Sequence, residues 1–132
     1  MKKLILQLII LCWATVAGAS LDRHFLPVVS NYNDSDYGAM LQNWCAVQDS
    51  CGVMHFGNNA GMLSFDGYRW QLSKLPRGTI VRALLCEGDR IYAGTFESFG
   101  YFHRDEKGAM RYVPLADSGM GFNMANEEIW SI

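Results

Sequence analysis

The chain has 132 residues, half of them hydrophobic, which is enough for one small domain with a buried core. Its 11 Lys and Arg residues are scattered among 13 Asp and Glu residues, and the formal charge is -2. This balance, without a basic stripe, argues against contact with nucleic acid.

Residues 1–19 have the three-part pattern of a secretory signal peptide. Lys2 and Lys3 precede an apolar run, and Ala17-Gly18-Ala19 offers the small residues that a signal peptidase needs, with cleavage after Ala19. The alternative is an uncleaved membrane anchor, but 16 residues from Leu4 to Ala19 are short for about 30 Å of hydrocarbon. Cleavage removes two lysines and no acidic residue, so the charge changes from -2 to -4. We therefore expect an exported, periplasmic chain.

Residues 20–42 form a lead-in to the regular part of the chain. Pro27-Val28-Val29 suggests a short extended piece, and turn-forming residues cluster between Asn31 and Gly38. No helical period is present. We expect a loop with at most one edge strand.

Residues 43–75 consist of short apolar runs separated by turn residues. The pattern predicts four strands, at 44–47, 53–56, 61–65 and 68–72. Asp66-Gly67 is the strongest hairpin signal in the chain, because both residues tolerate positive φ. Four antiparallel strands joined by tight turns form one blade of a β-propeller.

Residues 80–115 repeat this unit, with strands predicted at 80–85, 90–93, 99–102 and 110–113. A shift of 37 residues aligns the two units, and it places Val47 on Leu84, Met54 on Ile91, Gly57 on Gly94 and Phe65 on Phe102. Residues 129–132 then resemble the strand at 44–47, so a third unit opens. Self-similarity at this period indicates a stacked repeat.

The predicted fold is therefore all-β, with two four-stranded antiparallel β-propeller blades and the first strand of a third. Closed propellers use roughly four to eight blades. We expect this incomplete propeller to be the N-terminal part of a longer protein whose remaining blades are its partners.

The two units resemble the two-component regulator propeller repeat family, and the resemblance covers residues 43–132. The repeat residues that we single out are Trp44, Asp49, Gly52, Phe56, Gly57, Gly61, Phe65, Asp66, Gly67, Trp70, Tyr92, Gly94, Gly100, Phe102 and Trp130. One such repeat is a weak signal, whereas two in register behind a signal peptide are more specific.

The resemblance implies the periplasmic sensor region of a regulator anchored in the inner membrane. In that family a triple-tyrosine domain, a transmembrane helix and either a histidine kinase with response-regulator parts or a helix-turn-helix domain commonly follow. It implies signal transduction and transcription regulation, a small-molecule or oligosaccharide ligand, which could be derived from a glycan, and a homodimer of the full-length protein. Any kinase activity would lie downstream, so we expect no enzyme here. The alternative is a secreted β-propeller that binds carbohydrate or protein without signalling.

No catalytic set, metal site or cofactor motif stands out in the sequence. His24, His55 and His103 lack metal-ligand spacing, and strand alternation places His55 on the face opposite to its neighbours. The acidic residues expected in turns should hydrogen-bond the backbone there, and these are Asp49, Asp66, Glu87 and Asp89.

The cysteines and aromatic residues leave alternatives open. Cys45 and Cys51 could form a disulfide in an oxidising compartment and leave Cys86 over, or all three could fill strand positions. Six aromatic residues could line a sugar-binding surface or pack between blades, and their repeated strand positions favour packing: Trp44, Tyr68, Trp70, Tyr92, Phe99 and Tyr101. The sequence does not identify the ligand-binding loops.

Overall fold

The structure, a computed structural model, describes residues 27–132, with only the backbone of Asp117 and Ser118. The predicted signal peptide, residues 1–19, lies outside the described residues. Residues 31–132 form one compact unit, whereas residues 27–30 belong to a separate N-terminal unit and have no helix or strand.

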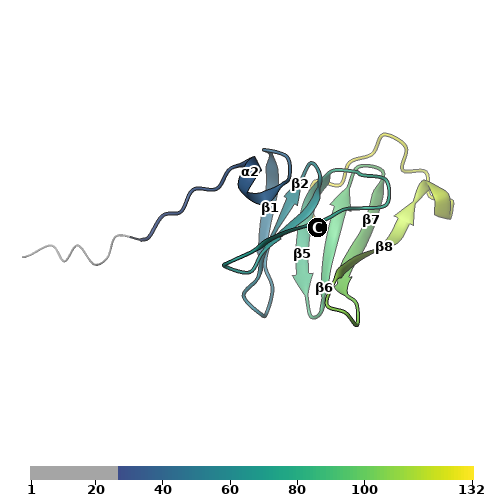
Figure 1. Cartoon of the computed structure of the whole chain (residues 1–132). Helices are drawn as coiled ribbons and strands as arrows, with labels where there is room; N and C mark the ends of the chain where they lie inside the picture. The colour runs from purple at the N-terminus through teal and green to yellow at the C-terminus, as the bar shows by residue number, and fades with distance from the viewer. Residues whose placement is uncertain (1–26) are drawn as a thin grey trace, which may run out of the picture. The chain divides into compact units, whose positions relative to one another are not determined.

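Two four-stranded antiparallel sheets make up this unit, each with its strands in sequential order (Figure 1). The first sheet, blade 1, contains β1 (Asn43–Gln48), β2 (Met54–Asn58), β3 (Gly61–Phe65) and β4 (Trp70–Ser73). The second, blade 2, contains β5 (Val81–Glu87), β6 (Arg90–Thr95), β7 (Ser98–Arg104) and β8 (Met110–Asp117), followed by a short 3-10 helix, η2 (Ser118–Met120). Both predicted blades are confirmed, and the described sheets do not close into a barrel.

The strand register confirms the 37-residue repeat in β2 and β3. Blade 1 pairs Met54 with Phe65 and Gly57 with Met62. Blade 2 has the same pairs 37 residues later, Ile91 with Phe102 and Gly94 with Phe99.

The alignment of Val47 with Leu84 is wrong by one residue. Val47 pairs with His55, and the residue that pairs with Tyr92, the equivalent of His55, is Leu85. Thus β1 corresponds to β5 with a shift of 38, because the stretch from Gln48 to Met54 is one residue longer than the equivalent stretch from Cys86 to Ile91. Leu84 instead faces blade 1 and joins the core between the blades.

The core lies between the two blades, where β5 packs against β1 and β2. It contains the buried residues Met62, Leu75, Val81, Leu84, Ile91, Ala93 and Phe102, with Cys45, Val47, Cys86, Met110 and Tyr112 at its edge. The blades approach closely at Gly57, where a Cβ atom would lie 2.8 Å from the Val81 carbonyl oxygen and 2.7 Å from the Cys45 Sγ.

The third copy begins in the expected place but not as a strand. Ile129 sits over Gly94, where a Cβ atom would lie 2.8 Å from the Ile129 carbonyl oxygen. This contact reproduces the one between Gly57 and Val81. Residues 129–132 nevertheless make no ladder, and only Glu128 forms an isolated bridge, to Phe96.

The lead-in differs from the predicted loop, because it contains a one-turn helix, α2 (Asp34–Tyr37). The Asn33 side chain accepts a hydrogen bond from the Ser35 N–H, and the Asp36 side chain accepts one from the Asn33 N–H. This capping box was visible in the sequence as Asn-x-x-Asp. The helix is too short to show a helical period, which explains why the pattern missed it.

The part of the lead-in that belongs to this unit, residues 31–42, covers the face of blade 1 that points away from blade 2. Tyr32 and Tyr37 contact Trp70, with ring centroids 5.2 and 5.5 Å away, and Phe65 stacks on the same indole at 4.3 Å. The fully buried Asn58 fixes the end of the lead-in through its amide group, which binds the N–H and the carbonyl oxygen of Met40. Aromatic packing therefore replaces a neighbouring blade on this side.

The close approach of the blades yields a test of the packing. We expect Gly57→Ala to lower the free energy of unfolding by about 1–3 kcal/mol, because the new methyl group meets backbone of the other blade. Gly94→Ala should cost less, since the atoms that it meets belong to Ile129, outside the ladders. Chemical denaturation measures both, and Tyr68→Ala, at an 85% exposed residue, is the control. Equal stabilities of Gly57→Ala and the control would contradict the interface.

Candidate functional site

The candidate site lies at one end of the two sheets, which we call the loop end. It comprises the β2–β3 turn at residues 59–60, the β4–β5 linker at 74–80, the β6–β7 connection at 96–97 and the segment 121–128. Sequential antiparallel strands place these alternate connections at the same end. The Thr79 hydroxyl donates to the Phe96 carbonyl oxygen at 3.1 Å, and the Glu97 N–H donates to the Glu127 carbonyl oxygen at 2.8 Å. Hydrogen bonds thus join three of these four segments.

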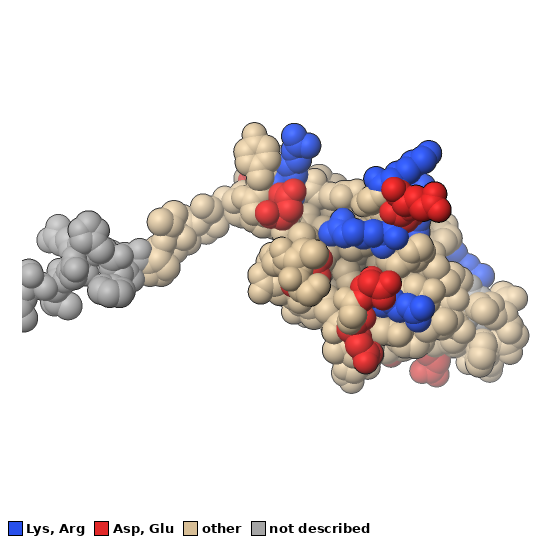
Figure 2. All heavy atoms as spheres, turned by 90° about the horizontal axis from the view of Figure 1, so that it is seen from below, with Lys and Arg blue, Asp and Glu red and all other residues tan. Residues whose placement is uncertain are grey.

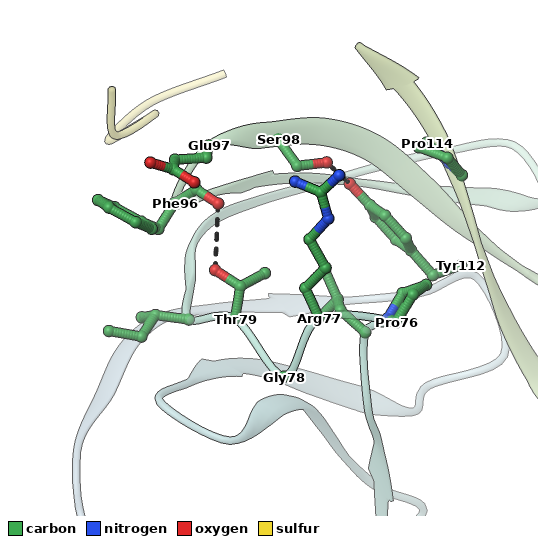
Figure 3. Close-up of a pocket in the computed structure, with 11 residues that line it drawn as sticks. Pro76, Arg77, Gly78, Thr79, Phe96, Glu97, Ser98, Tyr112 and Pro114 are labelled. Carbon is green, nitrogen blue, oxygen red and sulfur yellow. Dashed lines mark hydrogen bonds between the residues drawn. The ribbon is translucent and has the colours of Figure 1, made fainter. Parts of the chain in front are cut away.

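A cavity of about 370 Å³ opens between the β4–β5 linker and blade 2 (Figure 3). Its lining comes from the linker, from the β6–β7 connection, from the start of β7 and from β8, and it includes Pro76, Arg77, Thr79, Phe96, Glu97, Ser98, Tyr112 and Pro114. The Ser98 and Tyr112 hydroxyls are hydrogen-bonded at 2.9 Å. The cavity therefore combines apolar walls with hydroxyl, cationic and anionic groups, as small-molecule sites do.

A second feature of the loop end is a ladder of Trp44, Arg82 and Trp130. The Arg82 Cζ lies 3.8 Å from the centre of the Trp44 ring and 4.5 Å from that of Trp130. Trp44 and Arg82 occupy equivalent places, because each is the extra residue of a β-bulge in the first strand of its blade. Trp130 follows Ile129 as Arg82 follows Val81. The ladder thus joins the starts of three successive units through cation–π contacts.

Glu128 completes the ladder, since its Oε1 accepts a hydrogen bond from the Arg82 Nη2 at 3.0 Å. The Arg82 side chain is only 10% exposed. Its Nε and Nη1 atoms are buried without a hydrogen-bond partner among the described residues, and the guanidinium carbon lies over both indole rings. The sequence pattern missed Arg82, although the corrected shift of 38 would have aligned it with Trp44.

A buried hydrogen-bonded chain links Ser64, His55 and Asp49 in blade 1. The His55 Nε2 lies 3.1 Å from the Asp49 Oδ2, and the His55 Nδ1 lies 2.8 Å from the Ser64 Oγ. A carboxylate only accepts, so Nε2 carries the proton, and in the neutral ring Nδ1 accepts from the Ser64 hydroxyl. The side chain of His55 is fully buried and Ser64 is 7% exposed. We assign this chain a structural role, because it ties β2 and β3 to the β1–β2 turn.

The pKa values of His55 and Asp49 are both lowered in this chain, for different reasons. Burial lowers the pKa of His55 below its ordinary value of 6.5, although the hydrogen bond to Asp49 opposes that shift. For Asp49, burial raises the pKa, but hydrogen bonds from His55 and from the N–H groups of Val53 and Cys51 outweigh it and leave the pKa low. Arg104 of blade 2 reaches the same carboxylate, with its Nη2 3.7 Å from the Asp49 Oδ2. Blade 2 therefore contributes to the charge balance around His55.

The acidic turn residues lie at the opposite end of the sheets, and two of the four have the expected role. Asp49 accepts backbone hydrogen bonds from Cys51 and Val53, and Asp66 accepts them from Tyr68 and Arg69. Asp105, which the sequence analysis did not single out, caps its turn in the same way.

The hairpin predicted at Asp66-Gly67 is wider than a two-residue turn. Phe65 pairs with Trp70, so four residues connect β3 to β4, and of the two central residues expected to have positive φ only Gly67 has it, at 94°. The Asp66 carboxylate binds the two N–H groups that a tighter turn would have used in the ladder. As a result β4 begins at Trp70 and not at Tyr68.

The remaining repeat residues divide into turn, core and face positions. Gly52 and Gly61 have positive φ, and Gly100 leaves no room for a side chain beside β8. Phe102 is a core residue, whereas Phe56 lies on the lead-in face with Phe65 and Trp70. Tyr92 lies on the face of blade 2 that points away from blade 1, beside Phe99 and Tyr101.

The three cysteines within residues 27–132 are free thiols, so the pair Cys45–Cys51 that was left open is absent from the structure. Burial raises the pKa values of Cys45 and Cys86 above their ordinary values. Within residues 27–132 no group of three potential metal ligands gathers, and no helix is long and apolar enough to cross a membrane. On the face seen in Figure 2, acidic and basic side chains lie next to one another without an area of a single sign.

Comparisons with protein-family models, with curated proteins and with solved structures gave no match.

The buried His55 yields a pH prediction. Because its pKa is lower in the folded chain, the unfolded chain binds more protons below about pH 6.5, and the stability falls as the pH drops through the folded value. We expect the midpoint of thermal unfolding to decrease from pH 7 to pH 5, and His55→Leu to flatten this decrease. His55→Leu should also cost about 1–3 kcal/mol at pH 7, because it leaves Asp49 and Ser64 without their partner.

His103→Gln is the control for this titration, since His103 bonds only a neighbouring carbonyl oxygen at the surface. The control should keep the wild-type slope between pH 7 and pH 5. An unchanged slope in His55→Leu would show that other groups cause the acid sensitivity.

The Arg82 ladder yields a second prediction for the loop end. Arg82→Gln removes a charge-assisted hydrogen bond and two cation–π contacts, so residues 127–130 should loosen. Hydrogen exchange at the Ile129 and Glu97 amides, which bond Thr95 and Glu127, should accelerate about tenfold or more. Arg69→Gln, at an exposed arginine that contacts Tyr68, should leave both rates unchanged. Unaltered exchange in Arg82→Gln would mean that the ladder does not hold the segment.

Proposed function

We propose that the two blades are the N-terminal part of a periplasmic sensor ectodomain in a bacterial signal-transduction or transcriptional regulator. Its function is to recognise an extracellular ligand, such as a glycan fragment, and the ligand-binding site lies at the loop end. The family resemblance and the signal-peptide pattern suggest this role. The stacking of the blades supports the sensor scaffold that the role requires.

The observation that carries the proposal is the difference between equivalent positions in the two blades. In blade 1, His55 and Met62 are fully buried and Ser64 is 7% exposed, because they face blade 2. Their equivalents, Tyr92, Phe99 and Tyr101, are partly exposed, and Leu85 beside them is 41% exposed. An apolar face of this kind calls for a further blade as its partner.

The position of Ile129 supports the same partner. It occupies on blade 2 the place that Val81, the start of the next blade, occupies on blade 1. We therefore propose that further blades extend the stack into a propeller, which in the full-length protein is anchored in the inner membrane and forms a homodimer.

The loop end supports ligand recognition because two of its segments, the β4–β5 linker and the β6–β7 connection, line a cavity that has both polar and apolar groups. Binding residues are commonly found on loops that a rigid scaffold holds in place. The second candidate is a secreted propeller that binds carbohydrate or protein without signalling, and the same cavity supports it equally.

One experiment in the native host separates these two candidates. Cells with and without the gene are grown on a panel of neutral and acidic oligosaccharides, and their transcripts are compared. We expect one oligosaccharide to induce a set of genes only in cells that carry the gene. An antibody against residues 31–132 should detect the protein in the inner-membrane fraction, exposed to the periplasm.

Detection in the culture medium, with transcripts independent of the gene, would contradict the sensor and favour the secreted binding protein. A complementing copy with Tyr68→Ala controls for expression, because that exposed side chain lies in the β3–β4 turn, at the opposite end of the sheets from the loop end.

A further inference from the structure

The loop-end cavity has groups of opposite charge on its two sides. Figure 3 shows the Arg77 guanidinium directed toward the Ser98 and Tyr112 hydroxyls on one side, with Glu97 on the other. Arg77 comes from the β4–β5 linker, whereas the two hydroxyls belong to β7 and β8. Three segments distant in sequence thus converge on one wall of the cavity.

The Arg77 side suits a carboxylate. A guanidinium presents parallel N–H donors that match the two oxygens of a carboxylate, and hydroxyl donors next to it add further hydrogen bonds. The Ser98 and Tyr112 hydroxyls are already paired at 2.9 Å, which fixes their positions beside the guanidinium. Because one of these hydroxyls donates to the other, at most one hydroxyl proton can face an anion beside the guanidinium, and these groups are in place before the anion binds.

The Glu97 side suits a hydrogen-bond donor. The Glu97 Oε1 accepts a bond from the Asn126 N–H at 2.9 Å, and its backbone N–H is bonded to Glu127. Glu97 also has a φ of 59°, which a residue with a side chain rarely adopts. Hydrogen bonds to residues 126–127 therefore hold Glu97 in an unfavourable backbone conformation, with its carboxylate at the edge of the cavity.

The size of the cavity limits the ligand. Small-molecule pockets span roughly 300–1,000 Å³, and about 370 Å³ lies near the lower limit. Pro76, Phe96 and Pro114 add apolar groups to the lining. The ligand must be compact and must carry its charged and donor groups within a few bonds of each other.

We propose that this cavity binds a small carboxylic acid that carries hydroxyl or ammonium donors, with the carboxylate at Arg77 and the donors at Glu97. This assignment rests on the proposed recognition role of the loop end and adds the chemical class of the ligand. A sugar acid and an amino acid share this chemistry, and the test separates them.

Calorimetric titration of the full chain with D-glucuronate, L-glutamate and D-glucose tests the assignment. D-Glucose has the ring and hydroxyls of D-glucuronate without the carboxylate. We expect D-glucuronate, L-glutamate or both to bind saturably, and D-glucuronate to bind about tenfold more tightly than D-glucose if the sugar acid is the ligand. Arg77→Gln should weaken binding of the acid about tenfold or more, and Arg77→Lys should weaken it less.

Two further variants make the result specific. Glu97→Gln should weaken L-glutamate more than D-glucuronate, since it removes the charge that faces the ammonium group. Arg69→Gln alters an arginine at the opposite end of the sheets and should change no affinity, and circular dichroism verifies that each variant is folded.

Three outcomes would overturn the assignment: equal binding of D-glucose and D-glucuronate without L-glutamate binding, unchanged affinity in folded Arg77→Gln, or binding of none of the three compounds. In each case the transcript and fractionation experiment still decides whether the chain belongs to a sensor. If the acid binds but the transcript and fractionation experiment contradicts the sensor, the chain is a carboxylate-binding module without a signalling role.

Discussion

The structure depends on how closely one blade approaches the first strand of the next. At Gly57 the backbone of β2 and the carbonyl group of Val81 leave no space for a Cβ atom. This contact brings Met62 into one core with Val81, Leu84 and Phe102. The same contact recurs between Gly94 and Ile129. A single steric requirement, repeated after 37 residues, therefore sets the spacing of the stack.

The arrangement of polar groups follows from that spacing. Because blade 2 covers one face of blade 1, the His55 side chain has no contact with solvent, and Asp49 and Ser64 serve as its hydrogen-bond partners. The other face of blade 1 has no blade against it and is covered by aromatic side chains, because Tyr32 and Tyr37 of the lead-in pack against Trp70. Blade 1 thus has one face closed by a blade and the other by aromatic side chains, whereas the outer face of blade 2 stays partly exposed.

Most of the fold was predictable, and the deviations have physical causes. The eight strands and their sequential order follow from short apolar runs and turn residues, and β3 has the predicted bounds. The one-residue error at Leu84 arose because turns of different length leave the apolar pattern intact while they shift the register. Asp66 widened its hairpin since its carboxylate binds backbone N–H groups. The helix α2 escaped notice because one turn has no measurable period.

The sequence by itself determined the class of structure, because strand alternation and turn chemistry are local properties, and the repeat makes them visible twice. Only the tertiary structure decided which polar residues meet. Arg82 packs against both Trp44 and Trp130, and Arg77 lies beside Ser98 and Tyr112, through contacts between segments far apart along the chain. Such convergence depends on bulges, turn lengths and the path of the linker, which no local pattern records. The candidate site is therefore a product of how the blades stack.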